Sequence, residues 1–191
     1  MCGRYQMLYD DEHQELCKIR NEINAKYGQN QVKSGEIFPT NTVPILHAGA
    51  QKTEADLMIW GFPNFRSKGV IINARSETAP QKPFFRDSLL KRRCIIPSSG
   101  FFEWKQDGTK QKYLFEMPDA NCLYMAGVYQ TFGQENRFVI LTTDANPSIA
   151  EIHHRMPLVL TKDQVDDWIY RQDAALSLLT QPPPLLKKRA I

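Results

Sequence analysis

The sequence predicts one α+β domain, in which a β-rich, bent or barrel-like antiparallel sheet carries peripheral helices. Seven short apolar runs follow one another from about residue 42 to residue 143, and turn residues such as Asp107-Gly108 and Gly133 separate them. Helical patterns occur only outside this region, so the strand–helix alternation of a doubly wound fold is absent.

The first helix is expected over residues 9–27, where apolar residues recur at helical spacing: Leu16, Ile19 and Ile23. Asp10 or Asp11 is expected to cap its start, and Gly28 is expected to end it.

The strands are expected within residues 42–48, 55–62, 69–74, 93–105, 111–117, 122–132 and 137–143. A short helix is predicted over Pro147–His154, and another over residues 161–170, where Thr161 and Gln164 have capping-box spacing. We assign residues 1–180 to the domain and residues 181–191, which are proline-rich and then basic, to an extended or mobile tail.

Composition narrows the class of protein. Of the 191 residues 42% are hydrophobic, and no run of about 18 apolar residues would span a membrane. The start of the chain lacks the pattern of a secretory signal, so we expect a cytoplasmic protein. None of the four cysteines forms a C-x-x-C pair, and we expect reduced thiols, no metal and no cofactor. The net charge of +3 permits a polyanionic partner without requiring one.

Cys2 becomes the N-terminal residue if Met1 is removed, and it then carries a free α-amine beside its thiol. The amine has a pKa of about 7.7–8.0 and the thiol one of about 8.5, so both are usable nucleophiles. Together they can convert an aldehyde to an imine and then to a five-membered thiazolidine. Position alone indicates this weakly, because an early cysteine is more often an ordinary residue of a frayed terminus.

Three further clusters hold candidate chemistry. Asn73 and Arg75 alternate on one face after an apolar run, and they either line a cleft or mark a strand that leaves the core. Glu103 lies among aromatic residues, which raise the pKa of a carboxyl and suit it to proton transfer. His153 and His154 cannot share one helix face, so we expect at most one of them to point into a site.

These clusters belong to a set of motifs that occur in order along the chain. The motifs are Met1-Cys2-Gly3-Arg4, Pro39-Thr40-Asn41, Trp60-Gly61, NARSET (73–78), RCIIP (93–97), GFFEW (100–104) and IHHRMP (152–157). The set resembles the SRAP family, the SOS-response-associated peptidases or abasic-site processing proteins, from Cys2 to about Trp168. The resemblance implies the SRAP fold and a DNA damage protein that binds single-stranded DNA at abasic sites. It also implies self-removal of Met1, a thiazolidine crosslink between Cys2 and the abasic deoxyribose, and AP-lyase activity.

The resemblance assigns roles residue by residue. Cys2 is the nucleophile, Asn73 positions it, Glu103 shuttles protons, and His153 rather than His154 assists opening of the sugar. The residues that match DNA-contacting positions are Arg4, Arg75, Trp60, Trp104, Pro39 and Phe62. The segment after Trp60-Gly61 lacks the proline–tryptophan stretch common in the family, so Phe62 or Phe65 would have to supply the stacking ring.

Two other functions remain open. One is a peptidase or amidohydrolase with an N-terminal cysteine nucleophile, and the other is a non-catalytic reader of single-stranded or modified DNA. We expect a monomer with no membrane partner, which associates with the nucleoid when it is bound to DNA.

Overall fold

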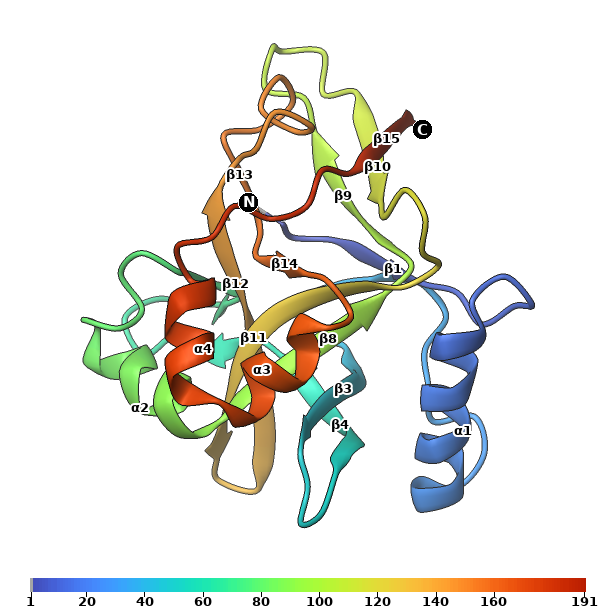
Figure 1. Ribbon diagram of the computed structural model, residues 1–191, viewed down its shortest axis with the longest axis vertical. Coiled ribbons are helices and arrows are strands. Elements are labelled where there is room, and N and C mark those ends of the chain that lie inside the picture. Colours follow the sequence, from blue (N-terminus) through green and yellow to red (C-terminus); the bar gives the residue numbers. More distant parts are fainter. Residues whose placement is uncertain (1) are drawn as a thin grey trace.

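A closed five-stranded β-barrel forms the centre of the computed structural model, which describes residues 2–191 (Figure 1). Its strands are β3 (Thr42–Ala48), β4 (Thr53–Trp60), β8 (Arg93–Ser98), β11 (Leu123–Phe132) and β12 (Glu135–Asp144). Around the ring the order is β12, β4, β3, β8, β11 and back to β12. Every pair is antiparallel except β12 with β4. The predicted barrel-like α+β fold is therefore confirmed, although one pair of the ring is parallel.

A second sheet of five strands stands beside the barrel and carries both ends of the described chain. In order across the sheet, its strands are β15 (Lys187–Ala190), β10 (Lys112–Glu116), β9 (Gly100–Trp104), β1 (Tyr5–Met7) and β2 (Gly35–Ile37). The apolar run over residues 93–105 is divided between the two sheets, because β8 belongs to the barrel and β9 to the second sheet. Ser99 makes the transition, and its N–H donates to the carbonyl oxygen of Gln6 at 2.9 Å.

Short strands attach further segments to these sheets. They are β5 (Phe62–Pro63), β6 (Val70–Ile71), β7 (Asn73–Arg75), β13 (Arg155–Pro157) and β14 (Val159–Leu160). Both β7 and β13 pair with β12, the first in parallel and the second antiparallel. β12 therefore brings the segment that contains Asn73 close to the segment that follows His153.

Four helices surround the sheets within residues 2–191: α1 (Gln14–Tyr27), α2 (Pro83–Lys91), α3 (Gln164–Tyr170) and α4 (Gln172–Leu178). In Figure 1, α1 lies at the right of the barrel, and the other three helices lie at its left and front. None of these helices is long and apolar enough to cross a membrane. The predicted capping box at α3 is half formed, because Gln164 Oε1 accepts the N–H of Thr161 at 3.0 Å and Thr161 offers no side-chain cap.

The first helix begins at Gln14 rather than near Tyr9. Asp10 Oδ1 accepts the backbone N–H groups of Glu12 and His13 at 3.1 and 3.2 Å. These bonds close a turn ahead of the helix, so Asp10 stabilises that turn instead of capping α1. Gly28 ends the helix as predicted, with φ at 92°.

The helix predicted over Pro147–His154 is wrong, because that segment folds into successive turns. Asn146 Oδ1 accepts the N–H of Ser148 at 3.0 Å, and such an Asx turn competes with helix formation. Asn146 Nδ2 donates to the carbonyl oxygens of Pro183 and Pro184 at 3.0 and 2.9 Å. The turn segment that leads to His153 is thereby tied to the C-terminal part of the chain.

The C-terminal segment, residues 181–191, is extended and ends as an edge strand of the second sheet. Leu186 is buried, and β15 pairs antiparallel with β10 from Tyr113↔Ala190 to Glu116↔Lys187. The division of the chain at residue 180 stays a prediction.

Substitution of Gly127 by alanine is expected to destabilise the barrel by about 1–3 kcal/mol, because it overpacks the interior. A Cβ at Gly127, on β11, would lie 2.4 Å from Ile96 Cδ1 and 2.8 Å from the carbonyl oxygen of Val139. Urea denaturation of the wild type and Gly127→Ala measures the loss. An unchanged transition midpoint and slope would show that the barrel has room at this position.

Candidate active site

Cys2 lies fully buried where the second sheet meets the barrel. Asn73, the first residue of β7, donates from Nδ2 to the carbonyl oxygen of Cys2 at 3.0 Å. The thiol of Cys2 lies 3.8 Å from the carbonyl oxygen of Arg4. Asn73 Oδ1 is also buried and has no hydrogen-bond partner within residues 2–191. Asn73 therefore fixes the backbone of Cys2 and keeps an acceptor beside it, and its role as a positioning residue in a reaction stays a prediction. The predicted removal of Met1 lies outside the described residues.

Glu103 on β9 lies within electrostatic reach of the Cys2 thiol. Burial raises the pKa of the thiol well above its usual range, and the carboxylate of Glu103 raises it further. Glu103 is itself 4% exposed, and burial raises the pKa of its carboxyl. The thiol is therefore protonated at neutral pH, while the carboxyl exchanges protons nearer to neutral pH than an exposed one does.

His153 is buried at the end of the turn segment, just before β13. The backbone N–H of Arg155 donates to Nδ1 of His153 at 2.9 Å. The carbonyl oxygen of Arg155 lies 3.0 Å from the same nitrogen and would favour the opposite tautomer. We assign the proton of the neutral ring to Nε2, because a backbone N–H can only donate and its contact is the shorter one. Burial lowers the pKa of His153 to about 4, and the adjacent His154 contributes to this shift, so the ring is neutral at pH 7.

His154 differs from His153 in exposure but not in ring orientation. The two rings stack with their centroids 4.6 Å apart, which a shared helix would not permit. His154 is exposed, and its Nδ1 lies 3.3 Å from Oε1 of Gln106. Of the two histidines His153 is therefore the buried one, and its catalytic role stays a prediction.

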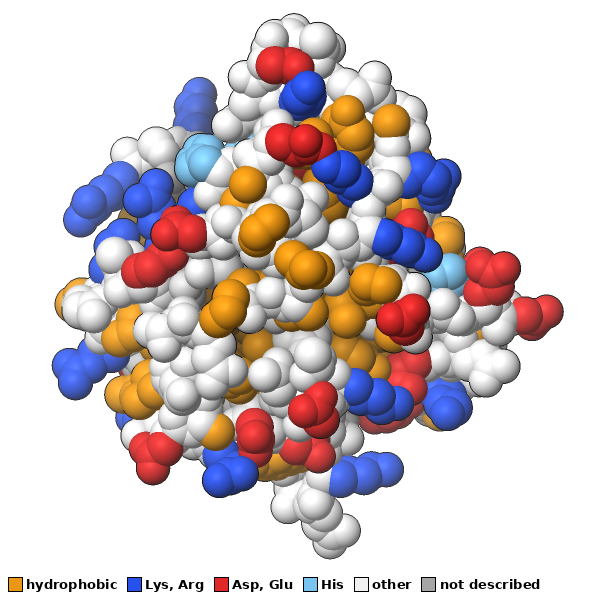
Figure 2. Space-filling view, turned by 45° about the horizontal axis from the view of Figure 1, so that its top comes forward, with side chains coloured by type: hydrophobic (Ala, Val, Ile, Leu, Met, Phe, Trp, Pro, Cys, Tyr) orange, Lys and Arg blue, Asp and Glu red, His pale blue; other side chains and the backbone are white. Residues whose placement is uncertain are grey.

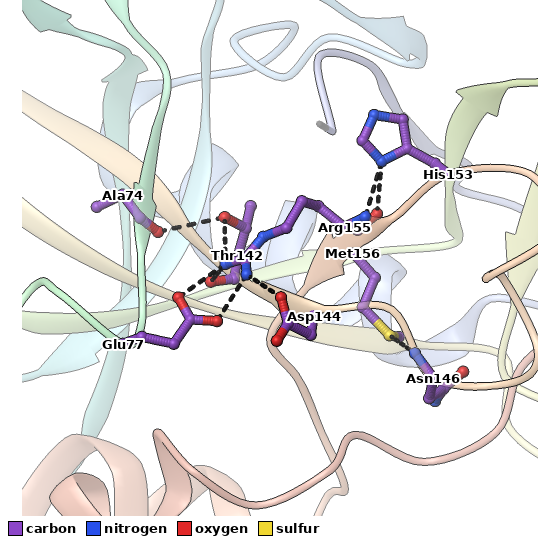
Figure 3. A network of polar contacts seen from close by, with 8 residues as sticks. All are labelled: Ala74, Glu77, Thr142, Asp144, Asn146, His153, Arg155 and Met156. Carbon is purple, nitrogen blue, oxygen red and sulfur yellow. Dashed lines mark hydrogen bonds and ion pairs between the residues drawn. The ribbon is translucent and has the colours of Figure 1, made fainter. Parts of the chain in front are cut away.

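Arg155 forms a polar network that the sequence did not single out (Figure 3). Its guanidinium donates to both carboxylate oxygens of Glu77, at 2.6 and 2.9 Å, and to Asp144 Oδ1 at 2.5 Å. It also donates to the carbonyl oxygen of Thr142 at 2.7 Å. Glu77 follows β7 and Arg155 opens β13, so their bidentate pair links the segments that carry Asn73 and His153. The adjacency of Arg155 to His153 in the IHHRMP motif was the available sequence signal.

Arg4 and Trp104 lie on the other side of the second sheet from Glu103, at the same end. The Arg4 guanidinium donates to Glu36 Oε2 at 2.9 Å. It lies 3.6 Å from the ring centroid of Phe38 and 5.5 Å from that of Trp104. Both predicted contact residues are partly exposed and therefore accessible to a ligand.

Trp60 and Phe62 are core residues, and this corrects their predicted place along a DNA path. Trp60 is fully buried, donates from Nε1 to the carbonyl oxygen of Ile72 at 3.0 Å, and packs against Tyr5 and Phe138. Phe62 is also fully buried, within a cluster of phenylalanine rings: Phe84, Phe85 and Phe132. Neither ring has a face that a base could reach.

Phe65 has the exposed ring that Phe62 lacks, with 78% of its surface accessible. Arg75 is exposed and Pro39 is partly exposed, so both are accessible, and their contact roles stay predictions. Within residues 2–191 there is no group of three His, Cys, Asp or Glu residues that could hold a metal ion.

Glu77→Gln is expected to lower the free energy of unfolding by about 1–2 kcal/mol at neutral pH. Burial acts to raise the pKa of Glu77, but its hydrogen bonds with Arg155 outweigh burial and lower that pKa. A depressed carboxyl pKa stabilises the fold above its unfolded value of about 4.3, and this stabilisation disappears as pH falls through the folded pKa.

Urea denaturation at pH 7, 5 and 3.5 should therefore show a difference between wild type and Glu77→Gln that shrinks with acidity. The exposed Glu12 provides the matched control, Glu12→Gln. A constant difference across this pH range would contradict the role given to the Glu77–Arg155 pair.

The chain is similar to known proteins of one family. Residues 1–189 match the family described as SOS response associated peptidase (SRAP). Abasic site processing protein YobE of Bacillus subtilis strain 168 is 35% identical over 188 residues, which cover 88% of this chain and 82% of YobE. Abasic site processing protein YedK of Escherichia coli K12 is 27% identical over 179 residues, which cover 90% of this chain and 81% of YedK.

A crystal structure of a protein from Bacteroides thetaiotaomicron has the same fold. It superposes with a TM-score of 0.81 at 24% identity, and the match covers all of this chain and 92% of that one. The barrel with its second sheet is therefore the architecture of a solved protein as well. From the match over residues 1–189 and the likeness to YobE, the chain belongs to the SRAP family.

Proposed function

We propose that this protein processes abasic sites in single-stranded DNA by forming a covalent crosslink through Cys2. The observation that carries the proposal is the hydrogen bond from Asn73 Nδ2 to the Cys2 carbonyl oxygen, which fixes the backbone of Cys2 within electrostatic reach of the buried carboxyl of Glu103. The curated relatives are named abasic site processing proteins, which supports the same substrate.

The reaction begins once the Met1–Cys2 peptide bond has been hydrolysed, in our proposal by the protein itself. An abasic deoxyribose is mostly a closed hemiacetal, and His153 assists its opening to the aldehyde. Glu103 takes a proton from the α-amine, which attacks C1′, and loss of one water gives an imine. The thiol then adds to the imine carbon, its proton passes to nitrogen, and a thiazolidine closes.

The order of the two nucleophiles follows from the burial of Cys2. Its thiol has a raised pKa, so little thiolate exists near pH 7. An α-amine titrates at about pH 7.7–8.0, so a useful fraction is uncharged there. The amine therefore attacks first, and the sulfur closes the ring on a carbon already activated as an imine. Without the thiol the imine persists, which permits strand cleavage by β-elimination, the lyase reaction of this proposal.

The DNA contacts in this proposal come from residues around the site. Arg4 and Arg75 hold phosphates, and Trp104 stacks on a base or sugar. We assign to Phe65 the stacking role that was considered for Phe62, because the ring of Phe65 is exposed and that of Phe62 is buried. We propose that the protein acts as a monomer.

The crosslink is tested with single-stranded DNA that contains one abasic site. Wild type is expected to give a heat-resistant shifted band on a denaturing gel, and Cys2→Ala to give none. Cys2→Ser keeps the amine but not the thiol, and it should give strand cleavage without a stable band. Intact mass of the wild type checks that Met1 is absent. No band with the wild type, or an equal band with Cys2→Ala, sinks the proposal.

His153→Gln and Glu103→Gln are each expected to slow crosslinking by about 10²–10⁴-fold, the usual contribution of one placed proton carrier. The exposed neighbour His154 supplies the matched control, His154→Gln, which should react at nearly the wild-type rate. Because burial lowers the pKa of His153 to about 4, the wild-type rate should show no inflection near pH 6.5. Single-turnover rates from pH 5 to 8.5 test this, and equal losses for the two histidine variants would contradict the assignment.

A further inference from the structure

The solvent side of the second sheet carries a row of cations and aromatic rings at the end where Cys2 lies. Side chains alternate along a strand, so Trp104 faces away from the side that holds Glu103. Trp104 is opposite Lys112, and Arg189 on β15 is opposite Leu114, two residues beyond Lys112. We call this surface the outer face and define it by its accessible residues: Phe38, Arg4, Trp104, Lys112 and Arg189.

Contacts between neighbouring strands hold the row together. Lys112 Nζ lies 3.9 Å from the ring centroid of Phe102 and 5.6 Å from that of Trp104. Arg4 covers Phe38 at 3.6 Å and approaches Trp104 at 5.5 Å. Cations and rings therefore alternate from β2 across β1 and β9 to β10, with Phe38 still 40% exposed.

Strand β15 extends the row to the edge of the sheet. All four of its residues are exposed, and three of them are basic: Lys187, Lys188 and Arg189. Figure 1 shows β15 beside β10 at the top of the molecule, near β9. Neighbouring strands lie about 4.8 Å apart, so the row from β1 to β15 spans roughly 14 Å. This length accommodates a few nucleotides of a single strand.

The charge of the outer face is locally positive. Arg4 and Lys112 share one carboxylate, that of Glu36, and Arg189 forms no ion pair within residues 2–191. On the face in Figure 2, Lys and Arg side chains are mixed with Asp and Glu, and hydrophobic side chains gather in the middle. The net charge of +3 is small, so local arrangement rather than the overall field selects a polyanion here.

We propose that the outer face binds the single-stranded segment that flanks the lesion, with phosphates on Lys112 and Arg189 and a base against Phe38. This inference rests on the proposed function and extends its contacts beyond Arg4 and Trp104. Alternating cations and accessible rings on an open sheet suit single-stranded nucleic acid, because phosphates meet the cations and bases stack on the rings. The segment reaches the face over the end of the sheet where Cys2 and Arg4 lie.

Fluorescence anisotropy tests the inference with a labelled single strand that carries a tetrahydrofuran abasic analogue, which has no aldehyde and cannot crosslink. Lys112→Gln and Arg189→Gln are each expected to raise the Kd by about threefold to tenfold and to lower the salt slope by about 0.7. Lys52→Gln is the matched control, because Lys52 is an exposed lysine outside the second sheet. Lys52→Gln is expected to leave both the Kd and the crosslinking rate unchanged.

Glu36→Gln separates recognition of phosphate from a structural role. The substitution removes the carboxylate that neutralises Arg4 and Lys112, so the Kd is expected to fall by about twofold to fivefold. If Glu36 has a structural role alone, Glu36→Gln should bind the DNA more weakly than the wild type or with the same Kd. Oligonucleotides that end at the lesion should bind wild type and Lys112→Gln equally, because the flanking segment is missing.

The outcomes also separate this inference from the proposed function. If the wild type neither binds nor crosslinks abasic DNA, the proposed function fails. If the wild type crosslinks but Lys112→Gln, Arg189→Gln and Glu36→Gln all bind the long single strand as the wild type does, the outer face is not a DNA surface and the inference is overturned.

Discussion

The hydrogen bond between Asn73 Nδ2 and the carbonyl oxygen of Cys2 is the constraint on which the rest of the site depends. A chain terminus is normally free to fray, and a nucleophile placed there would have no fixed position. Here β1 is paired on both sides, by β2 and β9, and Asn73 holds Cys2, three positions before the first residue of β1. The position of Cys2 therefore follows from the barrel, because β7 takes its own place from β12.

Burial shifts the pKa values of the titrating groups around Cys2 in opposite directions. The chemistry proposed for the site depends on these shifts. It raises the pKa values of the thiol and of Glu103 and lowers that of His153. All three groups are thereby biased toward their uncharged forms, as expected in a poorly solvated site. Such a site disfavours a permanent thiolate and suits amine attack followed by ring closure. The Arg155 network also links segments of the site directly, because its bidentate pair with Glu77 joins β13 to the turn after β7, two segments that each pair with β12.

The sequence was sufficient to predict the barrel-like sheet, because local apolar patterns define its strands. Ordered motifs indicated the four catalytic candidates, and their roles stay predictions. The sequence was insufficient where contacts between distant segments determine whether a side chain is buried or whether a segment is helical. Trp60 and Phe62 flank Gly61 at the Trp60-Gly61 motif, yet both rings are buried in the core, and burial is a property of the packed fold rather than of spacing. The segment before His153 has helical composition, but Asn146 and its bonds to Pro183 and Pro184 favour turns. The motif singles out the position of Arg155, but its pairing with Glu77 follows from the fold, because β12 brings the two segments together.

The outer face and the buried site lie on opposite sides of the second sheet, at the same end of β9. Alternation along β9 directs Glu103 inward and Trp104 outward, so the proposed chemistry and the proposed binding fall to adjacent residues on opposite sides of the sheet. The C-terminal segment contacts the surroundings of the buried site and also forms part of the outer face. It accepts a hydrogen bond from Asn146 in the turn segment before His153, and it ends as the basic edge strand β15.

Mass spectrometry of the digested crosslink tests the central claim most directly. The adduct is treated with a thiol-alkylating reagent under denaturing conditions and is then cleaved with trypsin after Arg4. The account predicts that the DNA is attached to Cys2-Gly3-Arg4, with Met1 absent, one water lost and the sulfur not alkylated. An adduct on another residue, a peptide that retains Met1, or an alkylated Cys2 within the adduct would contradict it.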